Sequence, residues 1–213
     1  MLLQIARGNQ QFLPCGRGMA GITVRQLLTH TSGIIRYPIT QEAVKRGREG
    51  IAQEILSHPL AYQPGADYIY SCNGFLLLGF ILEKLYGLPL EELYTRELKK
   101  PLGLKRTAFE IGFDEPNSAV CYRYRRTDPC ATRRFDDENV LAMRQVGGSG
   151  GEQSCLRDIE TFVTAVLEKN ELLYPKALFA AAEKNYTPIT ARGAALVTWW
   201  WTKRTGRQAA SFP

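Results

Sequence analysis

The sequence is poor in the side chains that most often carry catalysis or bind metals. Histidine occurs only twice, as His30 and His58. The five cysteines form no Cys-x-x-Cys pair, and neither histidine lies near a cysteine pair, so the spacing of a zinc site is missing. We therefore expect free thiols in a reducing compartment, and neither a metal nor another cofactor.

Long apolar runs and a leader pattern are missing as well. No uncharged stretch is long enough to cross a membrane. Residues 1–7 contain no basic segment followed by an apolar one, so the sequence as printed predicts no secretory signal and a cytoplasmic location. A longer N-terminus would change that expectation.

The net charge of +6 comes from arginines and lysines spread along the chain, with the densest run at residues 123–134. Such a run can bind phosphates or an acidic partner. No aromatic-interleaved RNA motif or recognition-helix pattern accompanies it, so we do not expect a nucleic-acid partner. We interpret the run as a solvated strand-and-loop region.

The pattern of the chain divides it into three parts. Residues 1–20 show neither helical nor strand periodicity, residues 21–190 are patterned like one domain, and residues 191–213 depart sharply from what precedes them. A shifted reading frame or a truncated gene would explain both atypical ends, and we expect that they are not native to the fold. Helices flanking a few strands make the fold class α+β.

Capping and turn residues predict where the helices begin and end. Thr23 starts a helix that we expect to run through His30 and to end at Gly33 in a left-handed turn. The helix at Cys155–Leu167 is amphipathic, with its apolar stripe at Ile159, Phe162, Val163 and Val166. The other predicted helices cover residues 41–57, Pro89–Lys100 and Pro175–Lys184, and strand-like runs cover Lys105–Ile111, Ala119–Arg125 and Ala194–Trp201.

The strongest helix signal is Asn73–Tyr86, which is apolar on nearly every side. A helix without a polar face is buried all round, so this one must lie inside a domain.

Two serine-containing patterns resemble nucleophile sites, and neither is favoured. Residues 147–151, Gly-Gly-Ser-Gly-Gly, satisfy the G-x-S-x-G pattern of a nucleophile elbow, which needs a histidine later in the chain. No histidine follows His58, so we interpret these residues as a flexible glycine loop. His30 and Ser32 could form a base and nucleophile pair, but near neighbours at a helix end point apart, and helix capping is favoured.

A third cluster lies where a turn meets the buried helix. Tyr70, Ser71, Cys72 and Asn73 bring together a phenol, a hydroxyl, a thiol and an amide. A neighbouring cation can lower the pKa of a phenol enough to make it a useful base. The structural alternative is a half-buried Tyr70 bonded to the backbone, with Asn73 as the helix N-cap.

Two ordered motifs favour the functional interpretation. Ile22-Thr-Val-Arg-Gln-Leu-Leu-Thr-His-Thr-Ser-Gly33 resembles a helix-and-turn segment common in the serine β-lactamase-like superfamily, which includes class C β-lactamases, penicillin-binding D-alanyl-D-alanine carboxypeptidases and related esterases. Gln63-Pro-Gly65, Tyr70-Ser71 and Phe75–Gly79 resemble the segment that carries the family's Tyr-x-Asn motif. The resemblance covers residues 21–112 well and continues weakly to residue 167.

The resemblance implies a fold and a set of roles. The fold would be an incomplete β-lactamase-like αβα sandwich, mainly its helical subdomain plus part of the sheet region. Tyr70 would be the general acid or base, and Ser71, Cys72 and Asn73 would contact a small-molecule or peptide-like substrate. Cys72 stands where the family has asparagine. We expect the chain to be a monomer.

The family's nucleophile pattern is absent from the printed chain. In the family a serine in Ser-x-x-Lys attacks the substrate, but no serine here has a lysine three residues later. Lys203-Arg-Thr-Gly206 is similar to the family's third motif, with an extra arginine. We therefore expect a serine hydrolase of amide or ester bonds, present as a truncated and inactive chain. The alternative is a non-catalytic binding or interaction module that uses a pocket at Tyr70 or the arginine-rich run at 123–134.

Overall fold

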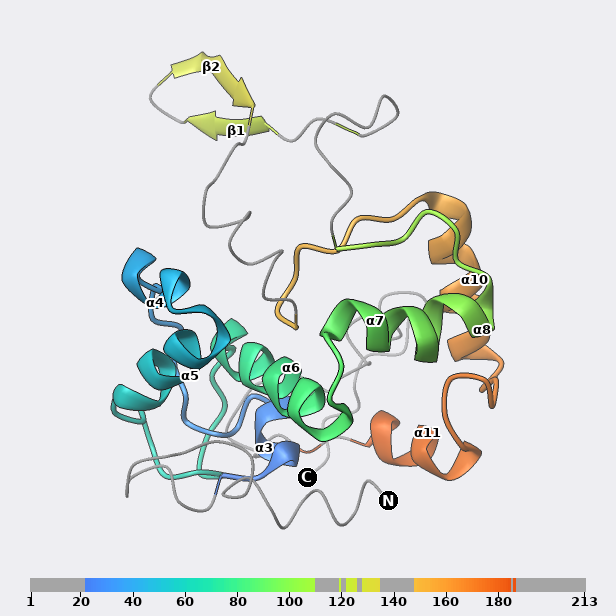
Figure 1. Ribbon diagram of the computed structural model, residues 1–213, viewed down its shortest axis with the longest axis horizontal. Coiled ribbons are helices and arrows are strands. Elements are labelled where there is room, and N and C mark those ends of the chain that lie inside the picture. Colours follow the sequence, from blue (N-terminus) through green and yellow to red (C-terminus); the bar gives the residue numbers. More distant parts are fainter. Residues whose placement is uncertain are drawn as a thin grey trace, which may run out of the picture.

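The chain is mostly helical in the parts that the computed structural model describes, which are residues 22–109, 119, 122–125, 128–134, 148–184 and 186. The labels follow Figure 1. The helices are α3 (Val24–Leu28), α4 (Gln41–Lys45), α5 (Gly47–Ser57), α6 (Cys72–Tyr86), α7 (Leu90–Tyr94), the π-helix η2 (Thr95–Lys99), α8 (Lys100–Leu102), α10 (Leu156–Leu167) and α11 (Lys176–Glu183). Strands β1 (Tyr122–Arg125) and β2 (Asp128–Arg134) form an antiparallel pair with an irregularity between Arg123 and Arg125.

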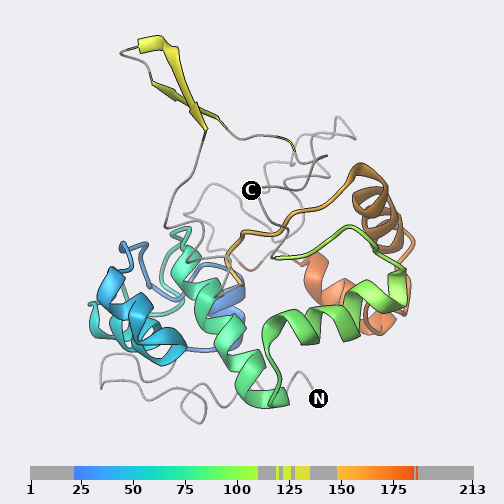
Figure 2. The ribbon, with the colours of Figure 1, turned by 45° about the horizontal axis from the view of Figure 1, so that its top comes forward.

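Helix α6 forms the centre of the described core. It contacts α3, α5 and α7, and α4 and α5 lie on one side of it while α7 and α8 lead away to α10 on the other (Figures 1 and 2). Burial is confirmed from Asn73 to Ile81, with Phe75 partly buried. It is wrong for the last turn, where Leu82 and Tyr86 are exposed. Gly87, with φ of 65°, ends the helix as predicted.

The helix predicted at residues 41–57 is two helices. Helix α4 ends at Lys45, and Gly47 opens α5 with a φ of 69°, a left-handed conformation that suits glycine. Gly50 lies against the end of α4, where a Cβ atom would come within 2.8 Å of the Ala43 carbonyl oxygen. The glycines that weaken a single helix therefore allow the chain to bend and pack closely.

The helix predicted at Pro89–Lys100 also differs from the structure. Pro89 is the N-cap rather than the first helical residue, and the chain passes through the π-helix η2 before α8. Pro101 falls within the first turn of α8, where a missing N–H is tolerated, so the helix continues to Leu102. Gly103, with φ of 68°, then ends it.

Helix α10 begins one residue later than predicted and buries a different face. Its buried residues are Asp158 and Ala165. Of the predicted apolar stripe, Ile159 is 47% exposed and Phe162 is 38% exposed. Helix α11 follows Pro175 as predicted, and its Phe179 is buried.

The strand-like run at Lys105–Ile111 contributes only an isolated antiparallel bridge between Ala108 and Gln153 within its described part. The second run is confirmed in β1. The predicted strand Ala194–Trp201 and the Lys203–Gly206 motif lie outside the described residues, as do residues 1–21.

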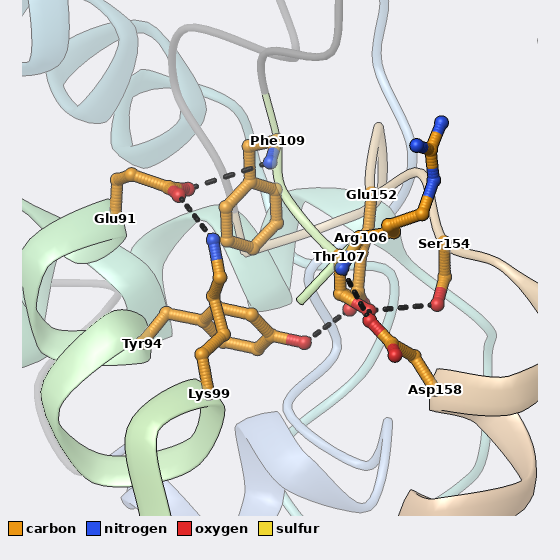
Figure 3. A network of polar contacts seen from close by, with 9 residues as sticks. All are labelled: Glu91, Tyr94, Lys99, Arg106, Thr107, Phe109, Glu152, Ser154 and Asp158. Atoms are coloured by element: carbon orange, nitrogen blue, oxygen red, sulfur yellow. Dashed lines mark hydrogen bonds and ion pairs between the residues drawn. The ribbon is translucent and has the colours of Figure 1, made fainter. Parts of the chain in front are cut away.

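Asp158 links α10 to the chain after α8 (Figure 3). Its Oδ2 accepts hydrogen bonds from the Arg106 N–H at 2.6 Å and from the Thr107 hydroxyl at 2.8 Å. Ser154 joins the network through its hydroxyl, 2.8 Å from that of Thr107. Asp158 is buried because these donors satisfy its charge.

A second group of contacts in Figure 3 joins α7 to the same region. The Tyr94 hydroxyl donates to the Glu152 carboxylate, and the Tyr94 ring meets Phe109 edge-on at 5.2 Å. Burial, and then the bond to Glu152, raise the pKa of Tyr94. Glu91 accepts from the Phe109 N–H and pairs with Lys99 at 3.6 Å. The chain at residues 106–109 is therefore held from both sides, by α10 and the residues just before it and by α7.

No single helix in the described ranges has the length and apolar character of a membrane span. Helices α6 and α7–α8 pass that test of length and composition only as a pair, and they meet at an angle of 79°.

Candidate functional site

Tyr70 lies just before the N-terminus of α6. Ser71 is the N-cap, with extended backbone at φ −142°, so the helix begins at Cys72 rather than at Asn73. Tyr70 is 57% exposed, which is more open than the half-buried position of the structural alternative. Its ring leans on His30, with the ring centroids 4.6 Å apart.

Cys72 is the residue that most affects the Tyr70 phenol. The thiol Sγ donates to the Tyr70 hydroxyl at 3.7 Å. The hydrogen bond and charge of Cys72 raise the pKa of Tyr70, burial adds to this, and Arg36 acts in the opposite direction. The cation expected to lower the pKa of Tyr70 is therefore outweighed, and the phenol holds its proton at neutral pH.

Ser71 and Asn73 have buried side chains, so Cys72 is the one of these three that is open to solvent. The Asn73 Nδ2 donates to the Ile35 and Tyr37 carbonyl oxygens at 3.3 and 3.2 Å. Asn73 therefore fastens α6 to the chain after α3, and the prediction that it is an N-cap is wrong. The Ser71 hydroxyl is buried and has no hydrogen-bond partner in the described part of the chain. The substrate-binding roles of Ser71, Cys72 and Asn73 stay predictions.

The end of α3 is closed by His30, three residues before the predicted stop at Gly33. His30 has a φ of 56°. Its N–H donates to the Leu27 carbonyl, and the next N–H, of Thr31, donates to the Gln26 carbonyl at 2.9 Å. These two bonds make a Schellman motif with a histidine in the left-handed position that glycine usually takes. The predicted capping by His30 is confirmed, and the backbone N–H of His30 makes it rather than the side chain.

The His30 side chain makes contacts that the sequence interpretation missed. Its Nδ1 accepts a hydrogen bond from the Ser71 N–H at 3.2 Å, and its ring packs against Phe75 with centroids 5.0 Å apart. In the sequence, the only sign of this role is a histidine beside Thr29, Thr31 and Ser32. The residues that His30 contacts, Ser71 and Phe75, lie about forty residues further along the chain. The predicted helix capping by Ser32 is wrong, because its Oγ accepts from the Ile34 N–H in a local turn that belongs to no helix.

Residues 30–33 run alongside the segment that leads to Tyr70. The carbonyls of His30, Thr31 and Gly33 accept from the N–H groups of Ile69, Gly65 and Ala61. Gly33 has a φ of 80°, and a Cβ atom there would lie 2.4 Å from the Tyr62 carbonyl oxygen. The two motifs of the sequence are therefore parts of one packed unit.

The glycine-rich loop packs against α6. Gly148 has a φ of 78°, and a Cβ atom there would lie 2.5 Å from the Phe75 carbonyl oxygen. Ser149 has a buried hydroxyl without a partner in the described residues, whereas Gly147 lies outside them. Close backbone approach explains glycine at 148 better than a nucleophile elbow does.

In the ranges that the structure describes, no three His, Cys, Asp or Glu side chains gather as a metal site would require. Cys72 and Cys155 are free thiols.

Replacing Cys72 by asparagine should lower the pKa of Tyr70 toward the ordinary value of about 10. The hydrogen bond and the charge of Cys72 are the two largest causes that raise the pKa of Tyr70, and asparagine carries neither the thiol nor its charge. NMR titration of ring-labelled tyrosine, with Tyr70→Phe to assign the signal, measures the midpoint. Cys155→Ala is the matched control and should leave that midpoint unchanged. An unmoved midpoint in Cys72→Asn would show that the thiol does not govern the phenol.

Comparison with known proteins places these motifs in one family. The Beta-lactamase family model matches residues 11–211. Candidate D-alanyl-D-alanine carboxypeptidases of Salmonella agona and Salmonella paratyphi B are 28% and 33% identical to the chain, and each alignment covers 71% of this chain. The chain spans 40% of the length of these curated relatives.

Solved structures agree in fold. A D-stereospecific amidohydrolase from a Streptomyces species superposes with a TM-score of 0.66 at 26% identity, covering 84% of this chain and 57% of that one. An octameric penicillin-binding protein homologue from Pyrococcus abyssi gives 0.65 at 22% identity, over 85% and 43%. The resemblance to the serine β-lactamase and penicillin-binding superfamily is confirmed, and the fold is β-lactamase-like. The chain belongs to the Beta-lactamase family.

Proposed function

We propose that this chain carries the tyrosine-bearing helical part of a serine hydrolase that cleaves amide or ester bonds through an acyl-serine. The described residues would belong to an incomplete αβα sandwich whose remaining strands come from the rest of the protein. Family membership and relatives named as carboxypeptidases and an amidohydrolase support this function. The substrate would be a small or peptide-like acyl compound, and the chain would act as a monomer.

The observation that carries the proposal is the position of Tyr70. It precedes the most buried helix of the described chain, and the N–H groups on either side of it are both bonded to His30. A phenol on a rigid support is suited to proton transfer, because acid–base catalysis requires a fixed distance to the reacting atom.

The protonation state of Tyr70 defines the step that it can perform. With its pKa raised by Cys72, the phenol keeps its proton at neutral pH, so the step open to it in this state is donation of that proton, as to a leaving group. To accept a proton from a serine, Tyr70 needs a cation to lower that pKa, and the family's Ser-x-x-Lys lysine is the group that the resemblance supplies. The printed chain contains no Ser-x-x-Lys, so we propose that it forms no acyl-enzyme on its own.

Covalent labelling tests this proposal. Protein of the printed sequence should not react with a fluorescent penicillin and should give no burst with nitrocefin or p-nitrophenyl esters. A longer protein, extended by flanking coding sequence that contains Ser-x-x-Lys, should be labelled. Tyr70→Phe should slow its acylation by about 10²–10⁴-fold, the usual contribution of a general acid or base.

Each of these labelling experiments can contradict the proposal. Acylation of the printed chain would reveal a nucleophile outside the family's pattern. Normal acylation of the longer Tyr70→Phe protein would remove Tyr70 from the mechanism. Tyr94→Phe is the matched control, since its phenol is engaged by Glu152 away from this site.

A non-catalytic binding module is the second candidate. It is favoured by the 57% exposure of Tyr70 together with the missing nucleophile pattern. Saturable, non-covalent binding of an acyl-peptide by the printed chain, lost in Tyr70→Ala without any acylation, would support it.

A further inference from the structure

We propose that His30 is a positioning residue that holds the backbone on both sides of Tyr70 and releases it when the imidazole is protonated. The catalytic meaning of this inference rests on the proposed function, whereas the switch itself is a property of the described fold.

His30 accepts hydrogen bonds from the backbone N–H groups of the residues on both sides of Tyr70. Its carbonyl accepts from the Ile69 N–H at 3.0 Å, and its Nδ1 accepts from the Ser71 N–H at 3.2 Å. The Tyr62 hydroxyl also donates to the His30 carbonyl, at 3.3 Å. One residue therefore fixes the chain immediately before and after the phenol, so Tyr70 is held although its side chain is exposed.

The ring of His30 supports the same segment. It lies 4.6 Å from the Tyr70 ring and 5.0 Å from the Phe75 ring, and it meets Tyr68 edge-on at 6.0 Å, centroid to centroid. Phe75 belongs to α6, so the imidazole bridges the core helix and the phenol. Exchange of this ring for a small side chain would free Tyr70 from its support.

The left-handed backbone of His30 shows that the position is enforced by its surroundings. A non-glycine residue with φ near 56° is strained, and such strain persists where several contacts determine the conformation. Glycine at position 30 would close α3 without that strain. The side chain must therefore be explained by its contacts to Ser71, Tyr70 and Phe75.

Protonation of the imidazole would break its hydrogen bond with the Ser71 N–H. Nδ1 accepts the Ser71 N–H only when the proton is on Nε2, and an imidazolium has no acceptor. Burial lowers the pKa of His30, so the neutral form is the one that the fold holds. The bond is present at neutral pH and is lost as pH falls through that lowered pKa.

The charged and titratable groups near His30 belong to classes that ordinarily change protonation outside the pH range of the proposed switch. Tyr68 and Tyr70 face its ring, Tyr62 faces its carbonyl, Arg36 and Cys72 act on Tyr70, and Asp67 acts on Tyr62 and adjoins Tyr68. Phenols, thiols and guanidinium groups titrate ordinarily above about pH 8, and carboxylates below about pH 5. Imidazole is the one of these side-chain classes whose ordinary pKa lies in between.

The test uses NMR on the chain as it is, following the Ser71 amide and the ring of Tyr70 between pH 4.5 and 8. In the native chain both signals should titrate together, with a midpoint below the usual histidine value of about 6.5. His30→Asn keeps an acceptor and tolerates positive φ, so it should preserve Ser71 amide protection and abolish the titration. His30→Gly keeps the backbone turn without an acceptor, so above the native midpoint the Ser71 amide should exchange about tenfold faster than in the native chain, as expected for one lost hydrogen bond, and the two should converge below that midpoint.

His58→Asn is the matched control, because the ring of His58 stacks on Tyr37 at 3.9 Å and not on this segment. It should keep the native profile. A Ser71 amide that does not titrate, or that stays protected in His30→Gly, would overturn the inference.

The longer Ser-x-x-Lys protein separates this inference from the proposed function. There, acylation should slow in His30→Gly and recover in His30→Asn. If Tyr70→Phe leaves acylation intact while the Ser71 titration is observed, the proposed function fails and the switch stands. If Tyr70→Phe slows acylation while His30→Gly does not, the positioning role fails and the function stands.

Discussion

Alanine at position 33 should lower the free energy of unfolding by about 3 kcal/mol or more, a large part of the stability of a typical domain. Two costs combine. Gly33 has a φ of 80°, which costs a residue with a Cβ atom about 1–2 kcal/mol. The added Cβ would also lie 2.4 Å from the Tyr62 carbonyl oxygen, a contact that only a backbone shift relieves. That shift would disturb the hydrogen bonds that join residues 30–33 to the segment before Tyr70.

Gly87→Ala and Gly103→Ala separate the two costs. Both glycines have a positive φ, 65° and 68°, but a Cβ atom added at either position would meet no other atom within 4 Å. They should therefore show only the conformational cost. Urea unfolding followed by circular dichroism measures all three variants. If Gly33→Ala and the two controls lose the same free energy of unfolding, the close approach to Tyr62 is relieved without cost.

Asp158→Asn should destabilise the chain by about 2–3 kcal/mol at neutral pH, because charge-assisted hydrogen bonds to a buried carboxylate are lost. Asp158 accepts from the Arg106 N–H and the Thr107 hydroxyl. In one orientation of an asparagine side chain, its NH2 group would face these two donors and could not accept from them. Glu160→Gln, an exposed change on the same helix, is the control and should have little effect.

The effect should depend on pH with a defined sign. Burial alone would raise the pKa of Asp158, but the Arg106 N–H, the Thr107 hydroxyl and further donors prevail and lower it. The carboxylate therefore stabilises the fold fully above its unfolded pKa of about 3.9, and this contribution is lost as pH falls through the lower folded value. Thermal unfolding at pH 7 and at stepwise lower pH should show native protein and Asp158→Asn converging in acid. A constant difference would contradict the assignment.

Local patterns were sufficient for most of the helical framework. Thr23 caps α3, Gly87 ends α6, and Pro175 precedes α11, because each acts within one turn of the chain. The apolar run at residues 73–81 predicted the buried core helix. The family motifs also lay in the sequence, since the residues around Tyr70 are close together along the chain.

The candidate site was predicted only in part. The sequence singled out Tyr70 as a site residue, and its structural alternative of a half-buried side chain is wrong, because Tyr70 is 57% exposed. Asn73 was a site residue by its position, yet its amide holds the backbone at Ile35 and Tyr37. His30 was interpreted as a local cap because its partner Ser71 is 41 residues away. Spacing along a chain does not reveal such partners.

By itself, the sequence determined which segments are helical, which helix is buried, and which family the Tyr70 segment resembles, because capping, periodicity and motif order are short-range properties. Tertiary structure decided the left-handed turn at His30, the close approach at Gly33, and the face of α10 that Asp158 buries. Each of these depends on a backbone group supplied by a distant segment. A hydrogen bond between residues far apart in the chain has no local signature until folding brings its donor and acceptor together.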